Sequence, residues 1–114
     1  MLKGLGALGD MTKMMKAAQE MQGKLAALQE ELGRKVVLGE AGGGAVKARV
    51  TAKGAVTGLD IDPSLLDPAQ KEVVEDLIIA AIRDAQIKGN DLAQTEMARI
   101  AEELGLPPGM GMPG

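Results

Sequence analysis

The chain of 114 residues contains no cysteine, histidine, phenylalanine, tyrosine or tryptophan, and it has one serine and one asparagine. These absences exclude thiol nucleophiles, imidazole acid/base groups, Cys/His zinc sites and Ser/His/Asp triads. Glu75, Asp76 and Asp84 have no second type of acid/base residue near them in the pattern, so carboxylate catalysis is not supported either. The sequence therefore predicts no enzyme active site, no cofactor and no small-molecule substrate.

Long hydrophobic runs are also missing. The longest apolar runs, such as 77–82, are far shorter than the roughly 20 residues of a membrane-spanning helix. Residues 1–9 are interrupted by glycine and do not resemble a secretory leader, and the lack of cysteine is typical of a reducing compartment. We therefore expect a cytoplasmic protein without a membrane partner.

The apolar residues, 46% of the chain, are all aliphatic. A domain of this size buries only about two thirds of its unfolded surface, and aliphatic side chains bury less area than aromatic ones. Self-association is therefore expected. The net charge of −3 is unevenly distributed, because residues 1–35 hold six cations and four anions whereas residues 63–114 hold four cations and nine anions. The N-terminal third is the part that would attract phosphate.

Apolar residues recur every three or four positions between residues 10 and 32. This spacing predicts a helix of about 22 residues that begins with Asp10 as N-cap and ends at Gly33. Residues 1–9 are predicted to be a flexible lead-in; their Gly-x-Gly-x-x-Gly pattern lacks the preceding strand of a dinucleotide site. The apolar seam of the helix consists of Met11, Met14, Ala18, Met21, Leu25, Leu28 and Leu32.

Three strand-like runs follow, and turns that contain glycine separate them. They predict a three-stranded antiparallel meander over residues 35–40, 45–52 and 55–62. Asp67 and Pro68 have the pattern of an N-cap and first residue of a second long helix, which Gly89 is expected to bend or break.

The predicted architecture is α/β, of the α+β type. It forms a single domain over residues 1–105, and residues 106–114, rich in Pro, Gly and Met, are predicted to be a flexible tail. Strands of about seven residues span about 23 Å, so both helices extend beyond the sheet. A projecting apolar seam needs a partner, which predicts a two-fold homodimer with helical arms. The residues expected to pack these arms are Met14, Ala18, Met21, Leu25 and Leu28.

Lys13, Lys16 and Lys24 share one face of the first helix, about 110° from the apolar seam. They are candidates for contacts with phosphate. The alternative is a solvated helix face, because Glu20 is spaced to pair with Lys16 and Lys24, and wheel geometry alone favours this alternative.

Two further patterns have structural explanations. Asp60, Asp62 and Asp67 have the side chains of a cation site, but Asp67 is explained as a cap and Asp62 as a turn residue. The glycines at 42–44 lack the Lys-Ser/Thr ending of a phosphate loop and indicate a hairpin turn. No metal site is predicted.

Five segments in one order resemble the YbaB/EbfC family of bacterial nucleoid-associated proteins. They are residues 15–22 (MKAAQEMQ), 39–47 (GEAGGGAVK), 61–66 (IDPSLL), 75–81 (EDLIIAA) and 106–109 (LPPG). The resemblance implies a tweezer-like homodimer that binds double-stranded DNA, alters its conformation and contributes to nucleoid organisation and gene regulation.

Within the resemblance, DNA contact is ascribed to the helical arms. It assigns this role to Lys16 and Lys24, with Lys13 beside them and Arg99 as a lesser candidate. Because the chain has no aromatic residue to stack on bases, DNA sequence is expected to be read weakly and groove shape to matter more. The rival interpretation is a protein-interaction module whose Met/Leu seam docks a partner helix. A third interpretation is a metal-dependent enzyme built on the aspartates.

Overall fold

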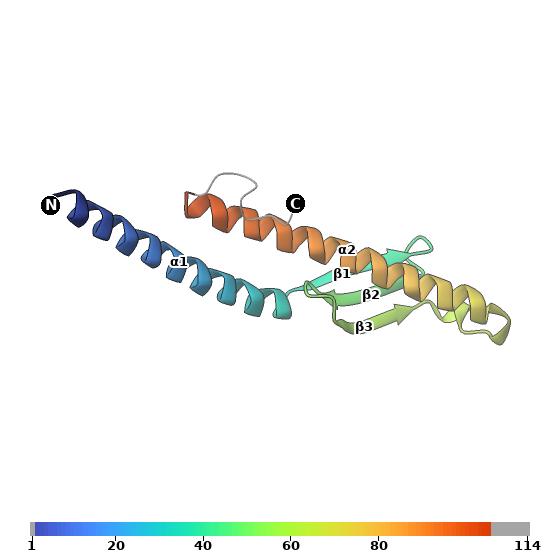
Figure 1. Cartoon of the computed structure of the whole chain (residues 1–114). Helices are drawn as coiled ribbons and strands as arrows, with labels where there is room; N and C mark the ends of the chain where they lie inside the picture. The colour runs from blue at the N-terminus through green and yellow to red at the C-terminus, as the bar shows by residue number, and fades with distance from the viewer. Residues whose placement is uncertain (1, 106–114) are drawn as a thin grey trace. The chain divides into compact units, whose positions relative to one another are not determined.

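The computed structural model describes residues 2–105, with side chains from residue 9 onward. The expected tail at 106–114 lies outside the described residues. The elements follow the predicted order, with two 3₁₀ turns, Pro63–Leu65 and Pro68–Gln70, before the last helix (Figure 1). The helices and strands are α1 (Leu2–Arg34), β1 (Val36–Ala41), β2 (Val46–Thr51), β3 (Val56–Ile61) and α2 (Lys71–Glu103).

Helix α1 is longer than the apolar seam predicted. It begins at Leu2, so Asp10 is not its N-cap, and residues 2–9 of the expected flexible lead-in belong to the helix. Each glycine costs about 1 kcal/mol relative to alanine, but extending an existing helix requires no new nucleus. The expected stop at Gly33 was also wrong, because α1 ends at Arg34 and Gly33 does not have a positive φ.

The three strands form one antiparallel sheet in the order β1-β2-β3, which confirms the meander. Strand β1 pairs with β2 from Val36 opposite Thr51 to Ala41 opposite Val46. The β1–β2 turn uses three successive glycines, Gly42–Gly44, with φ of 64°, 67° and 93°. Glycine adopts these values without the steric cost that a Cβ would add.

The core of the sheet lies between β2 and α2, which crosses one face of the strands (Figure 1). Val46, Ala48 and Val50 are fully buried, as the alternation in β2 predicted, together with Ala81 and Ala85 of α2. These small side chains bring the backbones close together. Because β2 and α2 lie close together, small aliphatic side chains fill the space between them, and the core needs no aromatic residue to avoid voids.

Glycine allows two further close approaches to α2. A Cβ on Gly39 of β1 would lie 2.2 Å from the carbonyl oxygen of Ala81, and a Cβ on Gly89 would lie 3.1 Å from Cα of Ala52. Helix α2 runs without interruption through Gly89, so a break there, one of the two expected alternatives, was wrong. Gly89 is explained by the close contact of the helix with Ala52, the residue that follows β2.

Two aspartates cap the 3₁₀ turns before α2. The Asp62 carboxylate accepts a hydrogen bond from the Ser64 amide at 2.9 Å, and the Asp67 carboxylate accepts one from the Ala69 amide at 3.0 Å. The bond from the Ser64 backbone lowers the pKa of Asp62 from its usual 3.8. The predicted cap at Asp67, with Pro68 at the first position, is confirmed. It caps a 3₁₀ turn that leads directly into α2.

The chain forms two compact units. One, named here the sheet unit, is Glu30–Thr95 and contains the sheet and most of α2; the other, the helical unit, comprises the described residues up to 29 and from 96. Within the helical unit Leu28, Ile100 and Ala101 are buried.

Candidate nucleic-acid interface

Lys13 and Lys16 lie on α1 in the helical unit and are exposed. Neither forms an ion pair with any carboxylate among the described side chains. The alternative pairing of Lys16 with Glu20 is therefore not formed. Two unneutralised ammonium groups one turn apart on a helix are suited to contact successive phosphates of a nucleic acid backbone.

Lys24, the third lysine of the predicted stripe, is neutralised. Its Nζ donates a hydrogen bond to Oε2 of Glu103 at 2.9 Å, and the two side chains are 43% and 51% exposed. The hydrogen bond and positive charge of Lys24 hold the pKa of Glu103 below its usual 4.5. No local sequence pattern indicated this pair, because its members are 79 positions apart and belong to different helices.

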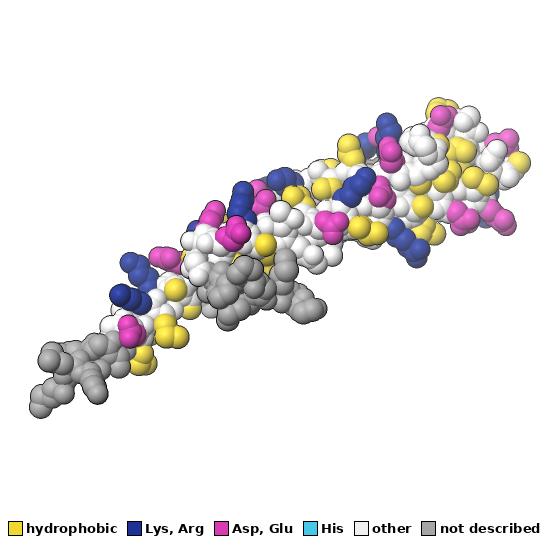
Figure 2. Space-filling view, turned by 90° about the horizontal axis from the view of Figure 1, so that it is seen from above, with side chains coloured by type: hydrophobic (Ala, Val, Ile, Leu, Met, Phe, Trp, Pro, Cys, Tyr) yellow, Lys and Arg dark blue, Asp and Glu magenta, His cyan; other side chains and the backbone are white. Residues whose placement is uncertain are grey.

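Arg99, the lesser candidate, is also paired, with Glu96 one turn earlier on α2. Three more cations are paired in the sheet unit: Lys71 with Glu75, Lys88 with Asp84, and Arg49 with Asp60. On the face in Figure 2, dark blue basic side chains alternate with magenta acidic ones over much of the surface. The cations without an ion pair among the described side chains are Lys13, Lys16, Arg34, Lys35, Lys47, Lys53 and Arg83.

Burial along the apolar seam of α1 increases toward its C-terminal end. Leu28 is only 3% exposed, and Met21 and Leu25 are half-buried. By contrast, Met14 is 72% exposed and Ala18 is exposed as well. Met14 and Ala18, two of the five residues predicted to pack the arms, therefore expose their apolar surface to solvent in the single chain.

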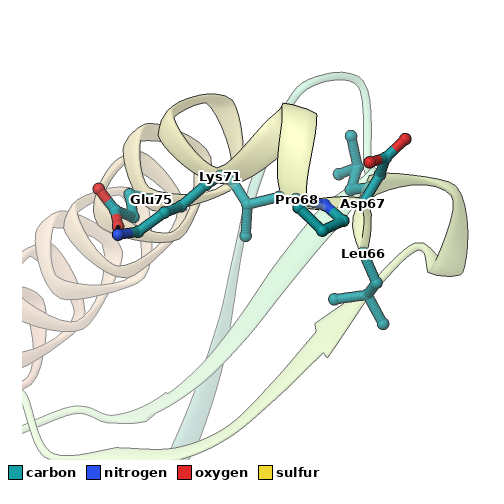
Figure 3. A pocket seen from close by; sticks show the side chains of 7 residues that line it. Leu66, Asp67, Pro68, Lys71 and Glu75 are labelled. Carbon is teal, nitrogen blue, oxygen red and sulfur yellow. Dashed lines mark ion pairs between the residues drawn. The ribbon is translucent and has the colours of Figure 1, made fainter.

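The hollow in Figure 3 lies in the sheet unit, where the 3₁₀ turns meet the start of α2. It has a volume of about 410 Å³ and is lined mainly by the apolar side chains of Leu65, Leu66, Pro68 and Val74. The Lys71 ammonium points to the Glu75 carboxylate 4.0 Å away rather than into the hollow. This hollow lacks the converging polar groups that fix a small-molecule ligand.

Carboxylates do not gather into a metal site in the part of the chain that the structure describes, where no group of three or more His, Cys, Asp or Glu residues could hold an ion. Asp60 pairs with Arg49, while Asp62 and Asp67 cap turns. Neither described helix has a stretch apolar and long enough to cross a membrane.

A family model and curated relatives each match most of the chain. The family model described as the YbaB/EbfC DNA-binding family matches residues 8–104. A nucleoid-associated protein of Bradyrhizobium sp. is 48% identical over 104 residues, which cover 91% of this chain and 98% of that protein. A nucleoid-associated protein of Nitrobacter hamburgensis is 43% identical over 105 residues, covering 92% and 99%.

A solved structure has a similar fold. The crystal structure of an uncharacterized protein from Helicobacter pylori matches with a TM-score of 0.63 at 21% identity, covering 74% of this chain and 88% of that one. At this identity the match supports the α+β fold alone.

Proposed function

Because the chain belongs to the YbaB/EbfC DNA-binding family, we propose that it is a nucleoid-associated protein that binds duplex DNA as a homodimer and alters the conformation of the DNA. Regulation of gene expression would follow from such changes in DNA conformation. The proposal assigns no chemical reaction to the protein.

The observation that carries the proposal is the pair of unneutralised lysines, Lys13 and Lys16, on α1. In a chain with a net charge of −3, binding to DNA requires cations that are not already paired with carboxylates. Each phosphate neutralised by such a cation releases counterions, which contributes a slope of about −0.9 to log K against log salt. Four contacts from two protomers would give a slope of about −3.6.

The homodimer in this proposal is supported by the exposed part of the α1 seam. Met14 and Ala18 continue the heptad pattern of Leu25 and Leu28 without burial in the chain itself. A second copy would present the same pattern, and two-fold pairing is the commonest way in which such a surface is covered. Dimerisation also doubles the number of lysines that reach one duplex.

Recognition in this proposal depends on the backbone and shape of the duplex. The chain has no aromatic side chain to insert between base steps, and Asn90 is its single asparagine. Phosphate contacts fix the position of a protein on the duplex but carry no sequence information directly. We therefore expect binding to unrelated sequences with similar affinity, and greater affinity where bending costs less.

The test is fluorescence anisotropy with unrelated labelled duplexes at about 50 and 200 mM salt, a range over which phosphate contacts weaken markedly. The double variant Lys13→Gln/Lys16→Gln is compared with Lys47→Gln/Arg83→Gln, which removes the same charge from exposed, unpaired positions of the sheet unit. The arm variant is expected to bind at least about tenfold more weakly, with a flatter salt slope. Equal binding by the two variants, or salt-independent binding by the wild type, would overturn the proposal.

The exposed methionines favour one alternative function. Met11, Met14 and Met15 lie in solvent on α1, and flexible methionine surfaces adapt to partner helices. A protein-interaction module of this kind would retain its partner when Lys13 and Lys16 are changed to Gln and would lose it when Met14 is changed to Asp. The Lys13→Gln/Lys16→Gln variant therefore distinguishes the two functions, because only duplex binding depends on these lysines. Met14→Asp would weaken both, since Met14 also lies on the seam of the proposed homodimer.

A further inference from the structure

Three basic residues occupy neighbouring backbone positions where α1 leads into β1. Arg34 is the last residue of α1, Lys35 connects it to the sheet, and Lys53 belongs to the turn between β2 and β3. The Ala52 amide donates a hydrogen bond to the Lys35 carbonyl at 2.9 Å, and Cδ of Lys53 lies 3.8 Å from the position of a Cβ on Gly33. Arg34, Lys35 and Lys53, named here the basic junction, are therefore neighbours within the sheet unit.

All three side chains of the basic junction are exposed, and none forms an ion pair with a described carboxylate. This is so although Glu30 and Glu31 lie in the last turns of α1. Lys71, Lys88 and Arg49 of the same unit, by contrast, are each paired. The basic junction accounts for three of the five unpaired cations of the sheet unit, the others being Lys47 and Arg83.

The backbone that carries the basic junction is held by a dense set of hydrogen bonds. In the β2–β3 turn the Thr51 amide donates to the Ala55 carbonyl and the Gly54 amide to the Thr51 carbonyl, both at 2.8 Å. The Gln86 side chain donates to the Gly54 carbonyl at 3.2 Å. The Lys35 amide donates a hydrogen bond to the Glu31 carbonyl at 2.9 Å, which continues the hydrogen-bond pattern of α1 by one residue. Cations on a preorganised backbone lose less entropy when they bind.

Stabilisation of the α1 C-terminus explains only part of this arrangement. Arg34 and Lys35 are well placed to interact with the negative end of the helix dipole. Lys53 is not on the helix, and its stem packs over Gly33, which adds a third charge to the same place. A guanidinium and two ammonium groups carried by neighbouring backbone positions, without carboxylate partners, match the anionic backbone of a nucleic acid.

We propose that Arg34, Lys35 and Lys53 form a second phosphate-contacting site for duplex DNA, separate from Lys13 and Lys16 on α1. This inference rests on the proposed function. It predicts that the sheet unit takes part in DNA binding and that α1 is not the sole contact. The salt slope of the wild type would then be steeper than the α1 lysines alone produce.

The experiment compares two triple variants of the full chain with the same change in charge. Arg34→Gln/Lys35→Gln/Lys53→Gln removes the basic junction, and Lys47→Gln/Lys71→Gln/Arg83→Gln removes three cations elsewhere in the sheet unit. Duplex binding is measured by anisotropy at about 50 and 200 mM salt. We expect the junction variant to bind duplex DNA at least about tenfold more weakly than the wild type. Its salt slope should flatten by about 0.9 for each phosphate that is no longer neutralised. The affinity of the control variant should fall by less than about threefold.

The outcomes separate this inference from the proposed function. If the wild type binds duplex DNA and the junction variant binds as tightly as the control, the basic junction is overturned and the α1 lysines remain the contact. If the wild type binds no duplex, both the proposed function and the inference about the basic junction are overturned. Thermal unfolding monitored by circular dichroism shows whether both triple variants are folded. If the junction variant is unfolded, the single variant Lys53→Gln replaces it, because Lys53 is at an exposed turn position outside the helix. For the inference to stand, Lys53→Gln must weaken duplex binding and flatten the salt slope.

Discussion

Lys24 on α1 and Glu103 on α2 are joined by an ion pair of 2.9 Å between Nζ and Oε2. This contact connects the two segments of the helical unit. It also neutralises Lys24, one of the three lysines of α1 that the sequence indicates as candidate DNA contacts. Because both side chains are about half exposed, solvent screens the pair, and such pairs contribute little to stability. A phosphate could therefore displace the Glu103 carboxylate from Lys24 at little cost.

Glu103→Gln is expected to strengthen duplex binding, because it frees Lys24 without adding charge repulsion toward phosphate. The expected gain is about twofold to fivefold, the equivalent of a surface ion pair, and the salt slope should steepen by about 0.9 per protomer. The measurement is duplex anisotropy at two salt concentrations. Glu102→Gln is the matched control, since Glu102 loses the same charge but forms no ion pair among the described side chains. Equal gains in both variants would mean that net charge, and not release of Lys24, is responsible.

Gly39→Ala is expected to destabilise the sheet unit strongly. The added Cβ would lie 2.2 Å from the Ala81 carbonyl oxygen and 2.3 Å from the Ala85 amide nitrogen, so β1 and α2 must move apart. Overpacking of this kind costs about 1–3 kcal/mol or more. Urea denaturation monitored by circular dichroism measures the change. An unchanged midpoint would contradict the close approach of β1 to α2.

Gly23→Ala is expected to have the opposite effect. Gly23 is an exposed position inside α1, and no atom lies within 4 Å of the place where a Cβ would be. The substitution gains about 1 kcal/mol of helix propensity without a clash. Thermal unfolding should shift upward. A decrease in the melting temperature would indicate that Gly23 is needed for packing against another chain.

Asp84 is expected to make the stability of the sheet unit depend on pH. Its carboxylate accepts hydrogen bonds from Lys88 Nζ at 2.9 Å and from the Glu40 amide at 3.0 Å, and these lower its pKa from the usual 3.8. A folded-state pKa below the unfolded value means that the contribution is present above about 3.8 and is lost as the pH falls through the lowered value. The difference in urea midpoint between wild type and Asp84→Asn should therefore be largest near neutral pH and shrink in acid.

Asp76→Asn serves as the control for this pH dependence. Asp76 lies on the same helix and forms no ion pair among the described side chains. The urea midpoint relative to wild type should change more with pH for Asp84→Asn than for Asp76→Asn, because only the former loses the hydrogen bonds from Lys88 and Glu40. A difference for Asp84→Asn that persists unchanged in acid would show that the Asp84 carboxylate does not contribute through its charge.

In the proposed homodimer, Met14→Asp is expected to separate the two copies without unfolding the chain. Met14 is 72% exposed in the single chain, so its replacement should leave the fold intact and remove the contacts proposed with a second copy. Leu28→Asp would be less informative, because Leu28 is 3% exposed and its replacement would also damage the helical unit. Sedimentation velocity measures the change. Gln19→Asp, about 140° from the seam on the helix, is the control and should remain dimeric; a wild type that sediments as a monomer would refute the dimer.

The local features of the fold could be predicted directly from residue order. The alternation of Val46, Ala48 and Val50 with charged residues predicted the buried face of β2, and Asp67 with Pro68 predicted the cap before α2. Each depends on residues only a few positions apart. Helix α1 is longer than the sequence pattern predicts, because the glycines near its N-terminal end are typical of a break, although extension of an existing helix tolerates them.

Residue order alone determined the succession of helix, three-stranded meander and helix, the thin aliphatic core and the presence of lysines on α1, because these follow from periodicity and side-chain chemistry. Tertiary structure decided which cations are available. Lys24 is paired with Glu103 from the other end of the chain, whereas Lys53 is brought beside Arg34 and Lys35. It also decided that Gly89 is a contact with Ala52 and not a break in α2. The reason is that these contacts join residues that are far apart in the sequence. Their interaction energies depend on how closely the fold brings the two backbone segments together, which no local sequence pattern encodes.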